Sequence, residues 1–144
     1  MNVSGINNVC YNQSFGTKVY VNREALNAIK QSPKNARSKI YKHIKDLKNN
    51  GVDDILLLRH EKYPGRNDAL VADIYANGLA KDKFVITSGW SAKDYIVDPH
   101  TYGNKNSYIS IKKLYQNLVE DLAYSRIFTD KSSCMPFIRK QIQL

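Results

Sequence analysis

Three groups of residues in this sequence carry side chains that acid–base or nucleophilic chemistry requires. The first places His60 beside Arg59, Lys62 and Arg66 in a predicted loop between two strands. Metal-independent RNA cleavage needs a base for the 2′-hydroxyl, an acid for the leaving oxygen and cations near the phosphate. We assign the acid or base role to His60 and the phosphate to Lys62 with Arg59 or Arg66. The ordinary alternative is an exposed charged turn, which Pro64-Gly65 also indicates.

The second group is Cys10, His60 and Asp98, which follow one another in the chain order of papain-like or glutaminase-like thiol enzymes. Such a site needs the thiolate at a helix N-terminus or beside a histidine. The residues after Cys10 lack an apolar helical stripe, so a thiol enzyme is the minor alternative. His43 is a lone histidine at the margin of a predicted helix face, where packing or solvation explains it.

The third group is Ser88-Gly89-Trp90, at the end of a β-prone run that starts at Phe84 and contains the only tryptophan. A tryptophan at a strand end ordinarily fills a core or an interface, because it buries a large area. As a site, the same residues would let Ser88 donate a hydrogen bond and Trp90 stack on a base.

A predicted helix over 33–50 carries the strongest charge pattern in the chain. Its apolar residues recur at spacings of four, four and three, and its cations occupy the remaining arc at about 100° per residue. Asp46 is the only acid among them, whereas a face that serves solubility alternates its signs. A solvated helix face is the alternative. The nucleic-acid contacts predicted here and in the first group are Lys34, Arg37, Lys42, Lys45, Arg59 and Arg66.

The composition fits one domain over residues 1–144, with ordinary apolar content and a net charge of +9. This charge attracts polyanions, so we expect RNA or an acidic protein as partner, with an anionic membrane surface as a further class. No segment has the apolar length of a membrane span. Cys10 and Cys134 predict neither a disulfide framework nor a zinc site, and we expect no metal and no cofactor.

The periodicities predict an α+β fold in which two N-terminal helices pack on a four-stranded antiparallel sheet, with a further C-terminal helix. Asn22 is the expected cap of the first helix, Ser32-Pro33 starts the second, and Gly51 ends it. A β-prone segment, 17–21, precedes the first helix. The expected helices are 22–31, 33–50 and 110–127, and the expected strands are 55–58, 70–76, 83–87 and 95–98.

The two ends of the chain have weaker patterns. Residues 1–14 form a polar leader without the basic and apolar regions of a cleaved signal peptide. This suits secretion without a cleaved signal and action in the cytoplasm of a target cell, and the alternative is an ordinary cytoplasmic protein. The tail, 128–144, contains Pro136 and is expected to be flexible or docked.

Short segments spread over the chain form one further pattern. They are Phe15-Gly16, Asn22–Leu26, His43–Asp46, Tyr75–Asn77, Phe84 and Ser88-Gly89-Trp90. In order and chemistry they resemble the colicin D-like nuclease domains of contact-dependent toxins, over roughly residues 15–92. The spacing into Ser88 is longer here.

The resemblance implies the fold grouped with barnase, EndoU and RelE, in which an antiparallel sheet cleaves RNA, and tRNA for colicin D-like domains. It also implies that Ser88 and Trp90 belong to the active site. The catalytic histidine of that family has no counterpart, because residues 8–11 are Asn, Val, Cys and Tyr. We therefore expect a bacterial toxin ribonuclease that uses His60, with a cognate inhibitor as a further partner. The alternative is a non-enzymatic secreted effector that binds an acidic partner.

Overall fold

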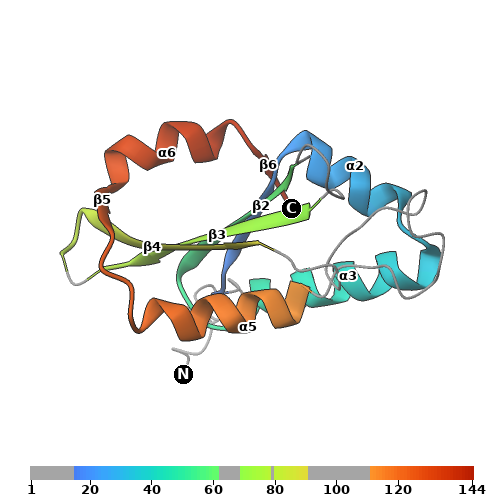
Figure 1. Ribbon diagram of the computed structural model, residues 1–144, viewed down its shortest axis with the longest axis horizontal. Helices are drawn as coiled ribbons and strands as arrows, with labels where there is room; N and C mark the ends of the chain where they lie inside the picture. Colours follow the sequence, from blue (N-terminus) through green and yellow to red (C-terminus); the bar gives the residue numbers. More distant parts are fainter. Residues whose placement is uncertain (1–14, 62–68, 79, 91–110) are drawn as a thin grey trace, which may run out of the picture.

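The computed structural model describes residues 15–61, 69–78, 80–90 and 111–144, with the side chains of Glu61, Ala69 and Trp90 left out. Within these ranges the chain forms four helices and one six-stranded sheet (Figure 1). In chain order the elements are β1 (Lys18–Val21), α2 (Arg23–Gln31), α3 (Lys34–Lys48), β2 (Asp54–Glu61), β3 (Ala69–Asn77), β4 (Lys83–Trp90), α5 (Ile111–Leu122), β5 (Phe128–Asp130), α6 (Lys131–Arg139) and β6 (Ile142–Gln143).

The sheet is mixed, and its strand order is β5-β4-β3-β2-β1-β6. β2, β3 and β4 form the predicted antiparallel meander. β1 runs parallel to β2, with Val19 opposite Leu56, because α2 and α3 form the crossover that a parallel pair requires. The α+β class is confirmed, and the four-stranded, purely antiparallel sheet is wrong. The predicted strand 95–98 lies outside the described residues.

Local signals set the ends of α2 and α3. The Oδ1 atom of Asn22 accepts a hydrogen bond from the backbone N–H of Ala25 at 2.8 Å, which confirms the predicted cap. Ser32 does not cap α3: its hydroxyl donates to the carbonyl of Ala28 at 2.9 Å, and Pro33 occupies the cap position. Gly51 has φ 76°, the left-handed conformation expected after α3.

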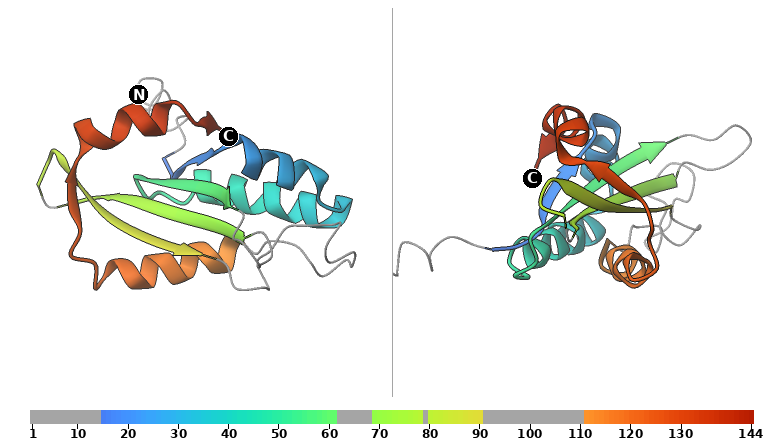
Figure 2. Two further views of the ribbon diagram at one scale, coloured as in Figure 1. Left: turned by 45° about the horizontal axis from the view of Figure 1, so that its top comes forward. Right: turned by 90° about the vertical axis from the view of Figure 1, so that its left-hand side faces the viewer.

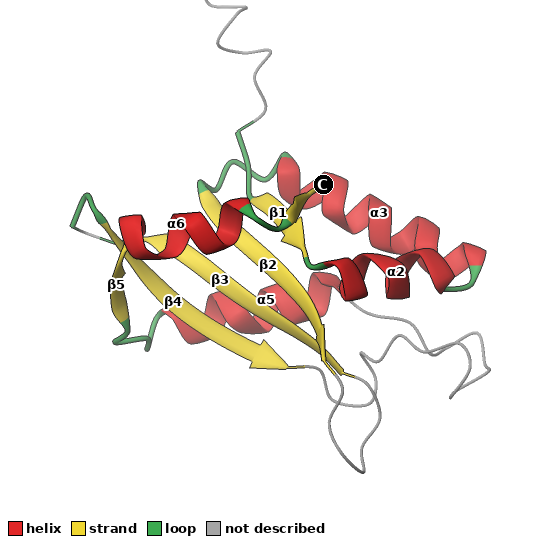
Figure 3. Cartoon of the chain, turned by 90° about the horizontal axis from the view of Figure 1, so that it is seen from above, coloured by secondary structure: helices red, strands yellow, loops and turns green. Residues whose placement is uncertain are grey.

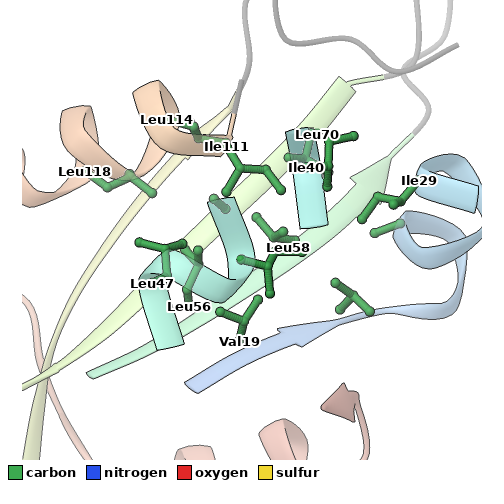
Figure 4. Close-up of a cluster of buried hydrophobic side chains, with 14 of the residues drawn as sticks. Val19, Ile29, Ile40, Leu47, Leu56, Leu58, Leu70, Ile111, Leu114 and Leu118 are labelled. Carbon is green, nitrogen blue, oxygen red and sulfur yellow. The ribbon is translucent and has the colours of Figure 1, made fainter. Parts of the chain in front are cut away.

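Two helical layers of unequal size cover the two faces of the sheet. α3 and α5 lie on one face and α6 lies on the other (Figures 1 and 2). The larger core joins α2, α3 and α5 to the strands, and Figure 4 shows its side chains between the helices and the sheet. Its largest fully buried side chains include Ile29, Ile40, Leu56, Leu58 and Ile111.

The C-terminal tail is docked on the sheet. β5 pairs with β4 at one edge, and β6 pairs with β1 at the other. α6 connects them and crosses over the strands (Figure 3). Ile138 is fully buried against a second core that includes Leu57 and Phe84. Of the two expectations for the tail, docking is the one that the structure confirms.

The described part of the chain contains no helix that is both long and apolar enough to cross a membrane.

Candidate functional site

The cations of α3 form an exposed surface on the side of the helix away from the sheet. Ala36, Ile40, Ile44 and Leu47 are buried, which turns the opposite arc outward. The structure places the five lysines of this helix at the surface, whereas Arg37 is half-buried and donates to the carbonyl of Lys30 at 3.0 Å. The exposed lysines are Lys34, Lys39, Lys42, Lys45 and Lys48.

α5 extends this basic surface. Its first turn carries Lys112 and Lys113, both exposed, and the helix lies beside α3 (Figure 1). We call the exposed lysines of α3 together with Lys112 and Lys113 the basic surface.

His43 lies at the seam between α3 and α5, and its pKa responds to the charges of both helices. Burial lowers its pKa below the ordinary value, Lys112 lowers it further, and Lys42 and Lys39 add to this against the opposing charge of Asp46. The imidazole is therefore neutral near pH 7. Cations from two helices thus act on the same point of the seam.

A cavity of about 230 Å³ opens at this seam. Buried Leu47 and half-buried His43 and Tyr115 contribute its inner lining. Four exposed polar side chains complete the lining: Asp46, Asn50, Lys112 and Gln116.

A buried polar network fixes the wall next to this cavity. Asp54 is 5% exposed, and its carboxylate accepts hydrogen bonds from Thr17 Oγ1 at 2.5 Å and from Tyr115 Oη at 3.1 Å. Asn50 Nδ2 donates to Thr17 Oγ1 at 2.9 Å, and Asn50 Oδ1 accepts from the backbone N–H of Thr17 and of Val52. Burial raises the pKa of Asp54, and the hydrogen bonds from Thr17 and Tyr115 oppose this rise.

The glycine of the predicted Phe-Gly motif belongs to the same corner. A Cβ atom at Gly16 would come within 2.1 Å of the carbonyl oxygen of Lys48, so only glycine lets this segment pass the last turn of α3. Here the backbone N–H of Gly51 also donates to the carbonyl of Phe15 at 2.8 Å.

The opposite face of the sheet carries a second polar cluster on β2, β3 and β4. Arg59 donates to both carboxylate oxygens of Asp73, at 2.8 Å from Nε and 3.2 Å from a terminal nitrogen. Ser88 Oγ donates to the same carboxylate at 2.6 Å. The structure therefore brings together two predicted site residues, Arg59 and Ser88. It does so through Asp73, which is 6% exposed and neutralises the arginine.

Tyr75 adjoins this cluster without adding a base. Burial is the main cause that raises the pKa of Tyr75 to about 12, with the charge of Asp73 next, and Arg59 opposes both. The phenol therefore keeps its proton near pH 7.

His60 does not join this cluster. β2 extends to Glu61, so Arg59 and His60 lie in a strand and not in the predicted loop. Successive strand residues point to opposite faces, and Arg59 bonds Asp73 on the α6 side of the sheet. His60 therefore faces the side of the larger core, where its backbone N–H donates to Asn22 Oδ1 at 3.3 Å.

The remaining predicted site residues lie outside what the structure describes. These are Lys62, Arg66, Cys10, Asp98 and the side chain of Trp90, whose backbone pairs with Val71. The glycine between Ser88 and Trp90 has a packing role, because a Cβ there would come within 2.8 Å of Leu118 Cδ2 on α5. Within the described ranges, no group of three or more His, Cys, Asp or Glu side chains is arranged to hold a metal ion.

Sequence reasoning missed the two carboxylates that organise these clusters. Asp73 interrupts an otherwise apolar run in a predicted strand, and Asp54 directly precedes another such run. A charged residue within or beside a buried strand needs a partner, and that signal was present at both positions.

Comparisons with protein-family models, with curated proteins and with solved structures find no match for this chain.

Proposed function

We propose that the protein binds RNA through the basic surface of α3 and α5. The observation that supports this is the one-sided charge of α3, where residues 34–48 hold six Lys or Arg and a single Asp. Five of these cations are exposed lysines, and the charges of two of them, with that of Lys112, act on His43. Lysines that neutralise the phosphates of a nucleic-acid strand release the cations condensed on that strand, and this release favours binding.

Binding of a short labelled single-stranded RNA, followed by fluorescence anisotropy over a series of salt concentrations, tests this proposal. Affinity should fall steeply with salt, by about 0.7 log units per log unit of salt for each phosphate contact. The double variant K42A/K45A should weaken binding and reduce that slope. The matched control K81A/K140A removes two exposed lysines outside the basic surface and should leave both quantities unchanged.

Two results would overturn the RNA proposal. One is an absence of binding at low salt, and the other is an equal loss in the two double variants. Poly-glutamate binding as tightly as RNA, with the same dependence on K42A/K45A, would replace RNA by an acidic protein as the partner.

A second candidate function is metal-independent cleavage of the bound RNA, as a bacterial toxin would perform it. Its support is the position of Ser88 and Arg59 on one cluster at the α6 face. Incubation with total tRNA in EDTA tests it, with Ser88→Ala and His60→Ala as a pair. Loss of cleavage with Ser88→Ala alone would locate the chemistry on the α6 face, and loss with His60→Ala alone would locate it on the other. Absence of cleavage by the unchanged protein would end this proposal.

A further inference from the structure

The cavity at the α3–α5 seam combines an apolar interior with a polar rim. Leu47 is 8% exposed, and the rings of His43 and Tyr115 are half-buried, whereas the four polar lining residues are exposed. At about 230 Å³ it is smaller than the roughly 300–1,000 Å³ of pockets that take drug-sized ligands. Its size and lining therefore suit one flat ring system with polar edges.

One ring and one amide of this cavity, those of Tyr115 and Asn50, are held in place by hydrogen bonds within the protein. Tyr115 Oη donates a hydrogen bond to Asp54. The amide of Asn50 makes two hydrogen bonds with Thr17: its Nδ2 donates to the hydroxyl, and its Oδ1 accepts from the backbone N–H. A rigid aromatic wall loses little conformational entropy when it stacks on a ligand. The network behind the cavity thus supports its shape.

His43 contributes its imidazole ring to the wall of the cavity. Its Nδ1 atom is buried and has no hydrogen-bond partner among the described residues. A base in the cavity would therefore meet the accessible part of a neutral aromatic ring, and stacking on aromatic side chains is how unpaired bases of RNA are held.

The charges and the apolar interior of the cavity favour a nucleobase over a simple anion or an acidic peptide. Asp46 at the rim opposes a simple anion, and the apolar interior does not suit a carboxylate side chain of an acidic peptide. Lys112 lines the opening, and the charges of Lys39 and Lys42 also act on His43, so cations that could bind phosphates surround this end of the seam.

We propose that this cavity binds a single unpaired nucleobase of an RNA strand whose phosphates lie on the basic surface. The inference rests on the proposed RNA binding and adds the recognition of a base. Stacking of one base contributes on the order of tenfold or more to affinity. The protein should accordingly prefer single-stranded RNA, whose bases can leave the stack.

A comparison of intact and fully abasic strands of equal length tests the base site apart from the phosphate contacts. The intact strand should bind about tenfold or more tightly than the abasic strand to the unchanged protein. Gln116→Trp, which fills the opening, should remove that difference and leave abasic binding unchanged. Asn117→Trp, on the exposed side of the same helix, is the matched control and should keep the difference.

A second variant guards against a new stacking contact from the introduced tryptophan. His43→Ala removes one wall of the cavity and should also lower the preference for the intact strand. Tyr41→Ala, an exposed aromatic of α3 that does not line this cavity, should leave it unchanged. Circular dichroism and thermal unfolding establish that each variant is folded.

The possible failures are distinguishable. Equal binding of intact and abasic strands, with both weakened by K42A/K45A, would overturn the base site and leave RNA binding in place. No binding of either strand would overturn the proposed function together with the base site. A preference for the intact strand that survives both Gln116→Trp and His43→Ala would locate base recognition elsewhere and overturn this inference.

Discussion

The two faces of the sheet use their charged residues in opposite ways. On the face of α3 and α5, the strands contribute apolar side chains to a core of sixteen buried residues, and the lysines lie on the outer side of the helices. The buried carboxylate of this face, Asp54 at the start of β2, is held by hydrogen bonds from Thr17 and Tyr115. On the α6 face, the described core has six buried residues, and Arg59, Asp73 and Ser88 project from the strands themselves. The difference follows from coverage, because a strand under a full helical layer has no solvent to receive a polar group.

On the α3–α5 face, a substitution of an exposed lysine can therefore change binding without changing stability. On the α6 face, a substitution in the polar cluster changes both. The lysines of α3 can change without opening a cavity, since their side chains lie in solvent. Asp73 is buried, so its removal disturbs the fold and the cluster together. Substitutions on the two faces test this difference, and those in the two cores should have the largest effect.

Ile40→Ala should lower the free energy of unfolding by about 2–5 kcal/mol, because it leaves a cavity in the larger core. Ile138→Ala removes an equally buried side chain from the smaller core and should cost less, since regions with fewer buried apolar contacts open at a lower free energy than the whole fold. Urea unfolding gives the free energies, and amide hydrogen exchange shows where protection is lost. Loss of protection throughout α3 in Ile138→Ala would contradict the expectation that the smaller core contributes less to the free energy of unfolding than the larger one.

Asp73→Ala should lower the free energy of unfolding by about 3 kcal/mol, because Arg59 loses the carboxylate that accepts two hydrogen bonds from its guanidinium group. The side chain of Arg59 is 27% exposed, and water at that side keeps the loss at the lower end for a buried pair. Ser88→Ala removes one hydrogen bond and should cost about 1 kcal/mol. Thermal unfolding measures both variants. An equal loss of stability in Asp73→Ala and Ser88→Ala would contradict the proposal that Asp73 holds the cluster together.

Asp54→Asn should change how stability depends on pH. Burial raises the pKa of Asp54 above 3.8, so the folded protein holds this proton to higher pH than the unfolded chain does. The contribution of Asp54 to the free energy of unfolding therefore falls as pH rises from 3.8 through the folded pKa, and it is constant above that. Asn does not titrate, so the free energy of the variant relative to the original protein should improve across that window. Parallel urea curves for the two proteins at every pH would contradict this.

Lys112→Ala should raise the pKa of His43 toward its ordinary value, because Lys112 is the strongest of the charges that lower it. Lys113→Ala is the matched control, since Lys113 is exposed and is not among the charges that act on His43. NMR titration of the imidazole measures both. A pKa that is equal in the two variants would contradict the joint field of α3 and α5.

Local patterns predicted α2, α3 and the β2–β4 meander to within a few residues. Asn22 caps α2 because its side chain reaches an N–H three residues away, and Gly51 ends α3 because its own φ is positive. The basic surface of α3 also follows from spacing, because apolar residues on one arc leave the cations on the other. Strand alternation was equally available, and it separates His60 from Arg59 once both are placed in β2.

The sequence by itself determined α2, α3, α5, the antiparallel meander and the one-sided charge, since each depends on residues a turn or a strand apart. It did not predict α6, which contains Pro136. Tertiary structure alone decided the parallel pairing of β1 with β2, the docking of α6, and the two polar clusters. Thr17 and Tyr115 meet across 98 positions, and Ser88 meets Asp73 across 15. No local periodicity encodes such pairs, because they form only when packing of the helices and sheet brings distant segments into contact.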